Sequence, residues 1–207
     1  YYKKLLSTVS DDYAVYAESP FDAAHRLLML GTDVSTRYKL RGTLMYRKYA
    51  EYLLKVAEAK AGNYIAFFPS YRFMEEVYEE FLALLEEKGG DVEYVMQSQY
   101  MSEEAREIFL ENFEEDRKNS LMGFCVLGGI FSEGIDLTED KLIGTVIVGT
   151  GLPQVCRERE LLRQYFDGQG VKGFDYAYLY PGMNKVLQAA GRVIRTDEDR
   201  GVILLLD

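Results

Sequence analysis

The chain has 207 residues, of which 48% are hydrophobic, and a formal net charge of −10. This composition suffices for one large or two small domains with a full core, and it excludes a uniformly basic nucleic-acid binder but not a local basic groove. Cys125 and Cys156 lie far apart and form no CxxC pair. They do not hold a zinc ion or an iron–sulfur cluster alone, and they indicate a reduced, cytoplasmic setting in a bacterial or archaeal cytosol or at the nucleoid.

The predicted elements alternate between strands and helices along the chain. Apolar runs and helical spacing predict strands at 13–17 and 27–30, a helix at 41–60, a strand at 63–70, a helix at 71–88, a strand at 91–97, a helix from Ser102 to about 117, strands at 121–129 and 142–149, a helix at 154–166, a strand at 175–181, a helix at 188–195 and a strand at 202–206. Strands that are apolar throughout are typical of a mostly parallel sheet with helices on both faces, and the α/β pattern predicts one domain.

No apolar run is long enough to span a membrane and no signal peptide is visible. Because the chain begins without Met and stops directly after an apolar run, we expect a fragment of a larger protein.

Two arginines lie near the end of the chain in QAAGRVIRTDEDRG, residues 188–201. Gln188, Arg192 and Arg195 fall at i, i+4 and i+7, one stripe of a helix, and Gly191 leaves room for another surface to approach. Two guanidinium forks aimed together suit a multiply charged anion such as phosphate. The alternative is a surface helix whose arginines pair with the acidic residues at 197–199.

Two further segments follow predicted strands. In FFPSYRF, Ser70 stands at a helix start, where free N–H groups and the helix dipole favour a phosphate, or where the serine is an ordinary N-cap. In GGIFSEGIDL, residues 128–137, glycines allow close approach of the backbone, and Ser132, Glu133 and Asp136 place polar groups after a strand. The alternative for this segment is an irregular surface loop. Ligands of doubly wound sheets bind beyond the carboxyl ends of the strands, where we expect all three segments to lie.

Taken together and in order, these segments resemble the C-terminal RecA-like motor domain of superfamily 2 helicases of the XPD/DinG type. NYIAFFPSY looks like motif IV, GGIFSEGIDL like motif V, and QAAGRVIRTDEDRGVILLLD like motif VI with its following strand. The segments ESPF, DVSTRY and GTGLP also fit this family, so the resemblance covers nearly the whole chain. It implies a RecA-like three-layer sandwich and a single C-terminal helicase motor domain over residues 1–207.

The resemblance assigns roles to named positions. Arg195 would be the arginine finger, Arg192 its partner on phosphate, and Gln188 would orient water or contact the nucleotide. The positions that would contact or couple to the bound nucleotide are Glu133, Gly134, Asp136 and Gly191. Ser70, Tyr71 and Ser132 would meet the nucleic acid. No GxxxxGK[ST] phosphate loop occurs in the chain, so an N-terminal RecA-like domain of the same protein would supply it, with ATP and Mg²⁺ shared between the two domains.

The resemblance therefore implies half of an ATP-dependent DNA helicase acting in repair or replication, which translocates on single-stranded DNA from 5′ to 3′ and is inactive as an isolated fragment. It allows an iron–sulfur cluster in another part of the full-length protein. It implies no metal ligand in this chain and no membrane as a partner. A non-catalytic nucleic-acid-binding or regulatory module that kept the fold is the main alternative, and a stand-alone nucleotide-binding enzyme is another. The candidates for a basic rim along DNA, or alternatively for a solvated helix face, are Arg37, Lys39, Arg41, Arg47 and Lys48.

Overall fold

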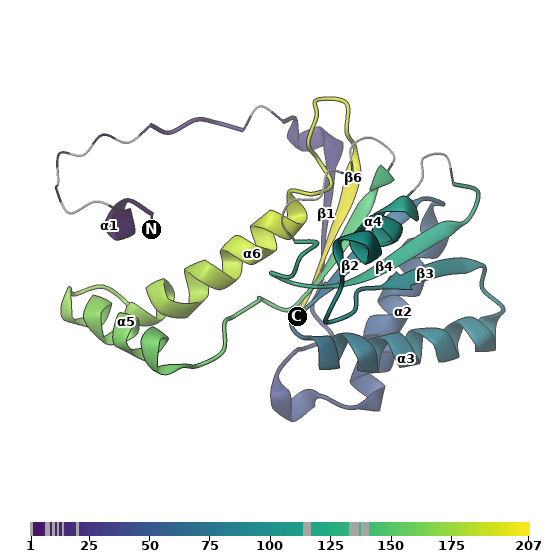
Figure 1. The fold of residues 1–207 in the computed structure, drawn as a ribbon, viewed down its shortest axis with the longest axis horizontal. Coiled ribbons are helices and arrows are strands. Elements are labelled where there is room, and N and C mark those ends of the chain that lie inside the picture. Colours follow the sequence, from purple (N-terminus) through teal and green to yellow (C-terminus); the bar gives the residue numbers. More distant parts are fainter. Residues whose placement is uncertain are drawn as a thin grey trace.

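A parallel sheet forms the centre of the molecule. The computed structural model of the chain describes residues 2–6, 9, 11, 13, 15–19, 21–113, 117–132, 137 and 141–207. Within them, six strands pair in the order β1-β6-β5-β2-β4-β3, and every pairing is parallel (Figure 1). The strands are β1 (Arg26–Gly31), β2 (Asn63–Phe68), β3 (Val92–Met96), β4 (Ser120–Val126), β5 (Gly144–Val148) and β6 (Gly201–Leu206). The predicted α/β fold with a parallel sheet is confirmed.

Helices connect the strands. They are α1 (Tyr2–Leu6), α2 (Thr43–Ala59), α3 (Tyr71–Lys88), α4 (Glu103–Glu111), α5 (Arg157–Gly168) and α6 (Tyr180–Ala190), with the short helical turns η1 (Ala23–His25), η2 (Tyr38–Leu40) and the π-helical η4 (Asp175–Leu179). The described residues include no helix long and apolar enough to cross a membrane.

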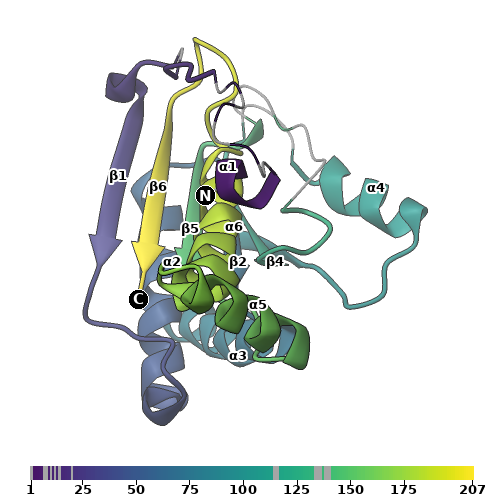
Figure 2. The same cartoon turned by 90° about the vertical axis from the view of Figure 1, so that its left-hand side faces the viewer.

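The two faces of the sheet carry separate cores. Along β2, Tyr64, Ala66 and Phe68 join the core under α2 and α3, whereas Ile65 and Phe67 join the core under α4 and α6. The helices of the two layers are seen in Figures 1 and 2. This alternation follows from the two-residue period of a strand, and it is why β2 is buried throughout. The result is a three-layer α/β sandwich with helices on both faces of the sheet.

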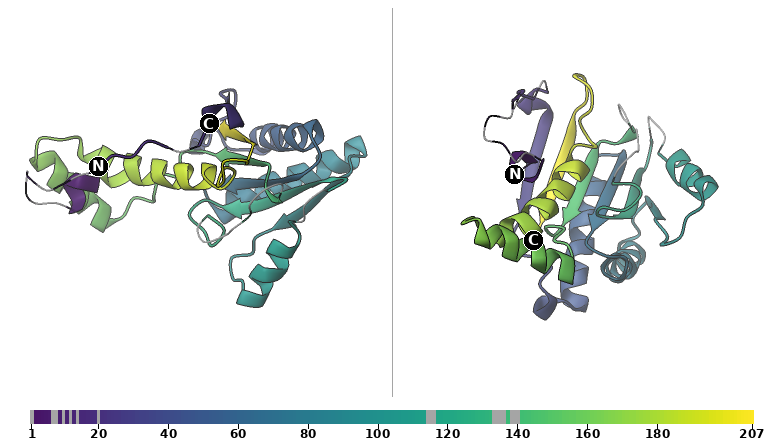
Figure 3. Two further views of the ribbon diagram at one scale, coloured as in Figure 1. Left: turned by 90° about the horizontal axis from the view of Figure 1, so that it is seen from above. Right: turned by 60° about the vertical axis from the view of Figure 1, so that its left-hand side comes forward.

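A helical arm extends beyond the sheet. α5 and the continuous η4–α6 segment lie side by side and project away from the strands (Figure 3). α1 packs near this arm, where the Asn184 side chain donates a hydrogen bond to the Tyr2 hydroxyl over 2.8 Å.

Two predicted strands are wrong. The described residues of 13–17 have no regular secondary structure, and Tyr13 is 94% exposed, because no neighbouring strand supplies backbone partners within the described part of the chain. Residues 175–181 are helical. Their aromatic residues favour strands by propensity, but Phe174 stacks on Tyr178 at 5.4 Å and Tyr176 meets Tyr180 edge to face at 5.3 Å. Both pairs have the i, i+4 spacing of a helix, so packing overrides propensity.

Helix boundaries also differ from expectation. α4 ends at Glu111 rather than near residue 117, because the Asn112 side chain donates to the carbonyl of Ile108 over 2.7 Å and closes the last turn. α5 begins at Arg157 because the preceding Cys156 is extended. The helix predicted at 188–195 ends at Ala190.

Candidate functional site

The carboxyl ends of β2, β3 and β4 lie side by side in the parallel sheet. Ser70 follows β2 as the N-cap of α3, and its hydroxyl oxygen accepts a hydrogen bond from the backbone N–H of Phe73 over 3.3 Å. This bond satisfies one of the free amides of the first helical turn. The predicted helix start is confirmed, while the contact of Ser70 with nucleic acid stays a prediction.

A buried glutamine connects these three strand ends. Gln97, directly after β3, donates from Nε2 to the Tyr71 hydroxyl over 2.7 Å, and its Oε1 accepts from the backbone N–H of Val126 over 3.0 Å. Partial burial raises the pKa of the Tyr71 phenol, against the smaller effect of the Gln97 hydrogen bond. Tyr71 is therefore a neutral hydroxyl in a fixed orientation. The sequence pattern gave Gln97 no role, because a glutamine after a strand carries no local signal.

The turn after β4 is closed by Ser132. Its hydroxyl accepts from the N–H of Gly128 over 2.7 Å and donates to the carbonyl of Val126 over 3.1 Å. The side chain is fully buried. Gly128 has a φ of 75°, in the left-handed region that favours glycine. These bonds favour a role for Ser132 in shaping the turn, and its predicted contact with nucleic acid remains untested.

Arg192 joins this turn to the end of α6. Its Nε and Nη2 both donate to the backbone carbonyl of Ser132, over 3.1 and 2.7 Å. A planar fork that straddles one acceptor fixes the guanidinium. Arg192 thereby connects the segments that follow β4 and α6. The contact of Arg192 with phosphate stays a prediction.

Arg195 lies in a turn and not on a helix. The Asp199 carboxylate, which is 5% exposed, accepts from the backbone N–H groups of Arg195 and Thr196, each over 2.7 Å. These bonds replace the helical partners that the amides would otherwise have, so the predicted stripe of Gln188, Arg192 and Arg195 on one helix is wrong. The turn precedes β6, so it lies at the amino end of that strand. The expectation that it lies beyond a carboxyl end is also wrong, because a chain enters each parallel strand at its amino end.

The remaining predicted nucleotide positions divide between described and undescribed residues. Gln188 is exposed on the last turn of α6, and Gly191 is exposed directly after it. Glu133, Gly134 and Asp136 lie outside the described residues.

A polar cleft opens between the amino ends of α2 and α3. It has a volume of about 440 Å³, and Arg41, Ser70 and Arg72 are among its lining residues. The Arg41 Nε donates to the carbonyl of Thr36 over 2.9 Å, and its guanidinium lies 5.3 Å from the centre of the Phe73 ring. This cleft places two arginines beside the N-cap of α3, and one of them, Arg72, lies 3.8 Å from the carboxylate of Glu76, which also lines the cleft.

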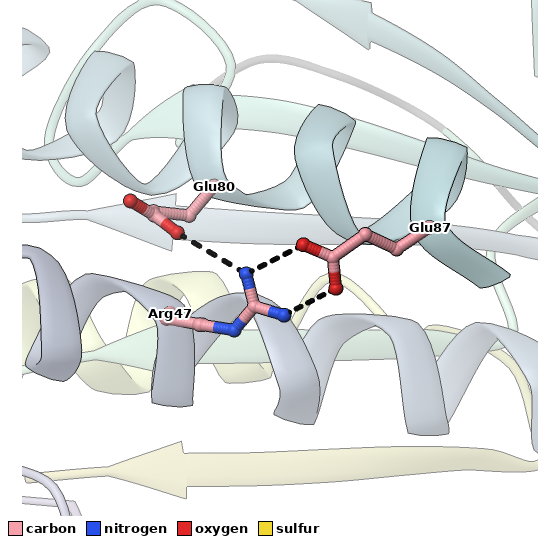
Figure 4. A network of polar contacts seen from close by, with 3 residues as sticks. All are labelled: Arg47, Glu80 and Glu87. Carbon is pink, nitrogen blue, oxygen red and sulfur yellow. Dashed lines mark hydrogen bonds and ion pairs between the residues drawn. The ribbon is translucent and has the colours of Figure 1, made fainter.

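Two other candidates for the basic rim form surface ion pairs. Arg47 of α2 makes a forked contact with Glu87 of α3, and its Nη1 also lies 3.9 Å from Glu80 (Figure 4). The hydrogen bond from Arg47 lowers the pKa of the Glu87 carboxyl. Lys48 pairs with Asp33 over 3.6 Å. The ion pairs of these two residues are what a solvated helix face would show, which is the alternative to a basic rim along DNA.

The described residues contain few side chains that could bind a metal ion or a cofactor. In the described part of the chain, no three His, Cys, Asp or Glu side chains gather as a metal site. Cys125 is buried, which raises its thiol pKa well above the ordinary value, and Cys156 is exposed on another element. The two thiols do not fit an iron–sulfur cluster, and the described residues offer arginines for a nucleotide but no phosphate loop.

Residues 53–207 match the family of helicase C-terminal domains. A probable ATP-dependent helicase of Methanocaldococcus jannaschii is 26% identical over 92% of this chain and 30% of its own length. The ATP-dependent DNA helicase XPD of Sulfolobus acidocaldarius is 25% identical over 86% of this chain and 30% of its length, and DinG of Photobacterium profundum is 28% identical over 91% and 26%. A solved apo XPD structure superimposes with a TM-score of 0.69 at 25% identity, over 88% of this chain and 36% of that one.

The matched segment, these relatives and the shared fold define a helicase domain of the RecA-like class. The chain belongs to the helicase C-terminal domain family, as the C-terminal helicase domain of an XPD/DinG-type helicase. It spans less than a third of the length of the curated relatives named above.

Proposed function

We propose that residues 1–207 form the second motor domain of an ATP-dependent DNA helicase and complete its ATP site with Arg195. The observation that supports this proposal is the turn in which a buried carboxylate, Asp199, holds the backbone of Arg195. A finger must meet the transferring phosphoryl group without reorganising, and a fixed backbone reduces the conformational freedom that would be lost. Such arginines accelerate phosphoryl transfer by roughly 10³–10⁵ in other nucleotide hydrolases.

In this proposal, ATP and Mg²⁺ lie between this domain and an N-terminal RecA-like domain that supplies the phosphate loop. Gln188 and Gly191, next to the turn of Arg195, would face the nucleotide. Glu133, Gly134 and Asp136 would transmit its presence to the DNA. Arg192 supports this coupling, because its bonds to Ser132 connect the region of the finger to the turn after β4.

The same proposal assigns single-stranded DNA to the carboxyl edge of the sheet. Ser70, Tyr71 and the arginines of the α2–α3 cleft offer a helix N-terminus, a hydroxyl and positive charge to a phosphate backbone. The Tyr71–Gln97–Val126 bonds tie this edge to β4, so a shift of the turn after β4 would reach the DNA contacts. Translocation from 5′ to 3′, in DNA repair or replication, is part of the proposal.

A non-catalytic module that kept the fold is the second candidate. The fixed Arg195 turn disfavours it, because a nucleic-acid binder has no need of a finger. The two candidates differ in ATP turnover by the full-length protein.

The test is an ATPase assay on the full-length protein with Arg195→Ala and Arg195→Lys. Loss of a finger lowers turnover more than ATP affinity, so we expect a drop of at least about 100-fold in DNA-stimulated ATPase with single-strand binding retained. Lysine should not restore activity, because it lacks the planar fork. Arg26→Ala, at the start of the β1 edge strand, is the matched control and should keep full turnover. Near-normal activity of Arg195→Ala would overturn the finger assignment.

The isolated chain provides a second test. Residues 1–207 should fold, hydrolyse no ATP and bind single-stranded DNA weakly, with an affinity that falls steeply as salt rises. Steady ATP hydrolysis by this chain that Arg195→Ala abolishes would contradict the division of the site between two domains.

A further inference from the structure

The sheet is incompletely covered at its β1 edge. On the face that carries α2 and α3, a cleft of about 670 Å³ opens between α2 and the two strands β1 and β6. Its floor is formed by Leu27, Met29, Val202 and Leu204, and its wall includes Tyr52 of α2. Most of the lining surface is therefore apolar.

The floor is continuous because the strands are in register. Leu27 pairs with Val202 and Met29 with Leu204, so the four side chains lie on the same face of the sheet. Leu27 is 55% exposed. An apolar hollow of this kind on a folded domain is a candidate binding site.

Among the described residues, three charged side chains line the cleft, and all three are positive: Lys55, Lys60 and Arg200. This contrasts with a chain whose net charge is −10. An occupant with an apolar side and negative charges would be complementary to both floor and rim.

The shape favours a helix over a strand. The floor is exposed at Leu27, partly exposed at Met29 and Val202, and buried at Leu204. It faces the helix layer, in the position that a further helix beside α2 would take in a three-layer sandwich. A strand added to the outer edge of β1 would pair with its backbone and leave this floor uncovered. We propose that the cleft docks an acidic amphipathic α-helix of a partner protein. This proposal is independent of ATP chemistry.

A peptide with a single tryptophan tests the proposal directly, because the chain contains no Trp. The probe is about 15–18 residues long, enough to form a helix, with leucines at i, i+3, i+4 and i+7 and glutamates on the opposite face. We expect saturable binding to residues 1–207 with a blue shift of the tryptophan emission. A scrambled peptide of the same composition and a peptide with lysines in place of the glutamates should bind at least about tenfold more weakly. Equal binding of either comparison peptide, or no binding of the probe, overturns the proposal.

Variants locate the binding on the cleft. Leu27→Glu should weaken binding at least about tenfold, since burial of a leucine side chain typically exceeds one decade in affinity. Lys55→Glu, at the exposed rim of the cleft, should weaken it about two- to fivefold. The matched controls Leu44→Glu and Lys88→Glu change exposed residues outside the cleft lining and should bind as wild type.

Circular dichroism melting verifies that each variant is folded. If Leu27→Glu does not fold, Lys55→Glu and its control still decide the outcome. Unchanged affinity of Lys55→Glu overturns the placement in this cleft. Binding by residues 1–207 but not by the full-length protein would show that a helix of the same polypeptide fills the cleft, and it would overturn the proposal of a separate partner.

Discussion

Replacing Asp199 with alanine tests whether a single buried carboxylate holds the turn of Arg195. The carboxylate accepts two backbone hydrogen bonds of 2.7 Å each, from Arg195 and Thr196. A hydrogen bond to a charged group contributes about 1.5–3 kcal/mol, and partial exposure of the two donor residues allows water to replace part of it. The expected loss is therefore about 2 kcal/mol of the free energy of unfolding.

Thermal unfolding of residues 1–207 measures this loss. For a domain of this length, 1 kcal/mol corresponds to about 2–4 °C, so Asp199→Ala should lower the Tm by about 4–8 °C. Asp199→Asn should lower it less, because the amide oxygen still accepts but without charge. Asp197→Ala is the matched control, since Asp197 is exposed in the same turn, and it should change stability by less than about 0.5 kcal/mol. Equal melting temperatures for the Asp199→Ala and Asp197→Ala variants would refute the reasoning.

Gln97→Leu should lower the free energy of unfolding, measured in urea, by about 1–3 kcal/mol, because it leaves the backbone N–H of Val126 and the Tyr71 hydroxyl without their buried partner. A loss no larger than the loss on replacing an exposed glutamine by leucine would show that water replaces the amide. Glu87→Gln should lower the Tm slightly at neutral pH by removing the ion pair with Arg47. Since the pKa of Glu87 is lowered in the folded state, this difference should be present above the ordinary titration range of a glutamate and vanish as the pH falls through the folded pKa; a difference that persists in acid would rule out the ion pair as its cause.

Local signals in the sequence predicted the regular parts of the fold. α3 runs from Tyr71 to Lys88 as expected, because Ser70 caps its start and Gly89, with a φ of 64°, ends it in the left-handed conformation. The central strands were found from unbroken apolar runs, which is how strands buried on both faces read. Both signals act within a few residues, so they are visible without the tertiary structure.

The candidate site was less accessible to this reasoning because distant residues define it. The helical spacing of Arg192 and Arg195 was misleading, since α6 ends at Ala190 and the backbone N–H of Arg195 bonds the Asp199 carboxylate in place of a helical carbonyl. The role of Gln97 depends on two neighbours that the fold brings to it. The cleft beside β1 exists because of the strand order, which no local pattern specifies.

The strand order also delays the pairing of β1 during synthesis, because its partner β6 is synthesised last. Thr36, shortly after β1, bonds Asp207, directly after β6, across 171 residues of chain. At roughly 5–20 residues per second, a ribosome needs on the order of 10–30 s between these points. During that interval β1 has no strand to pair with, because β6 is its only neighbour among the described strands. The leucines of β1 therefore stay exposed to solvent until β6 is synthesised. We expect chaperones to bind the nascent chain, or aggregation to begin, mainly at β1.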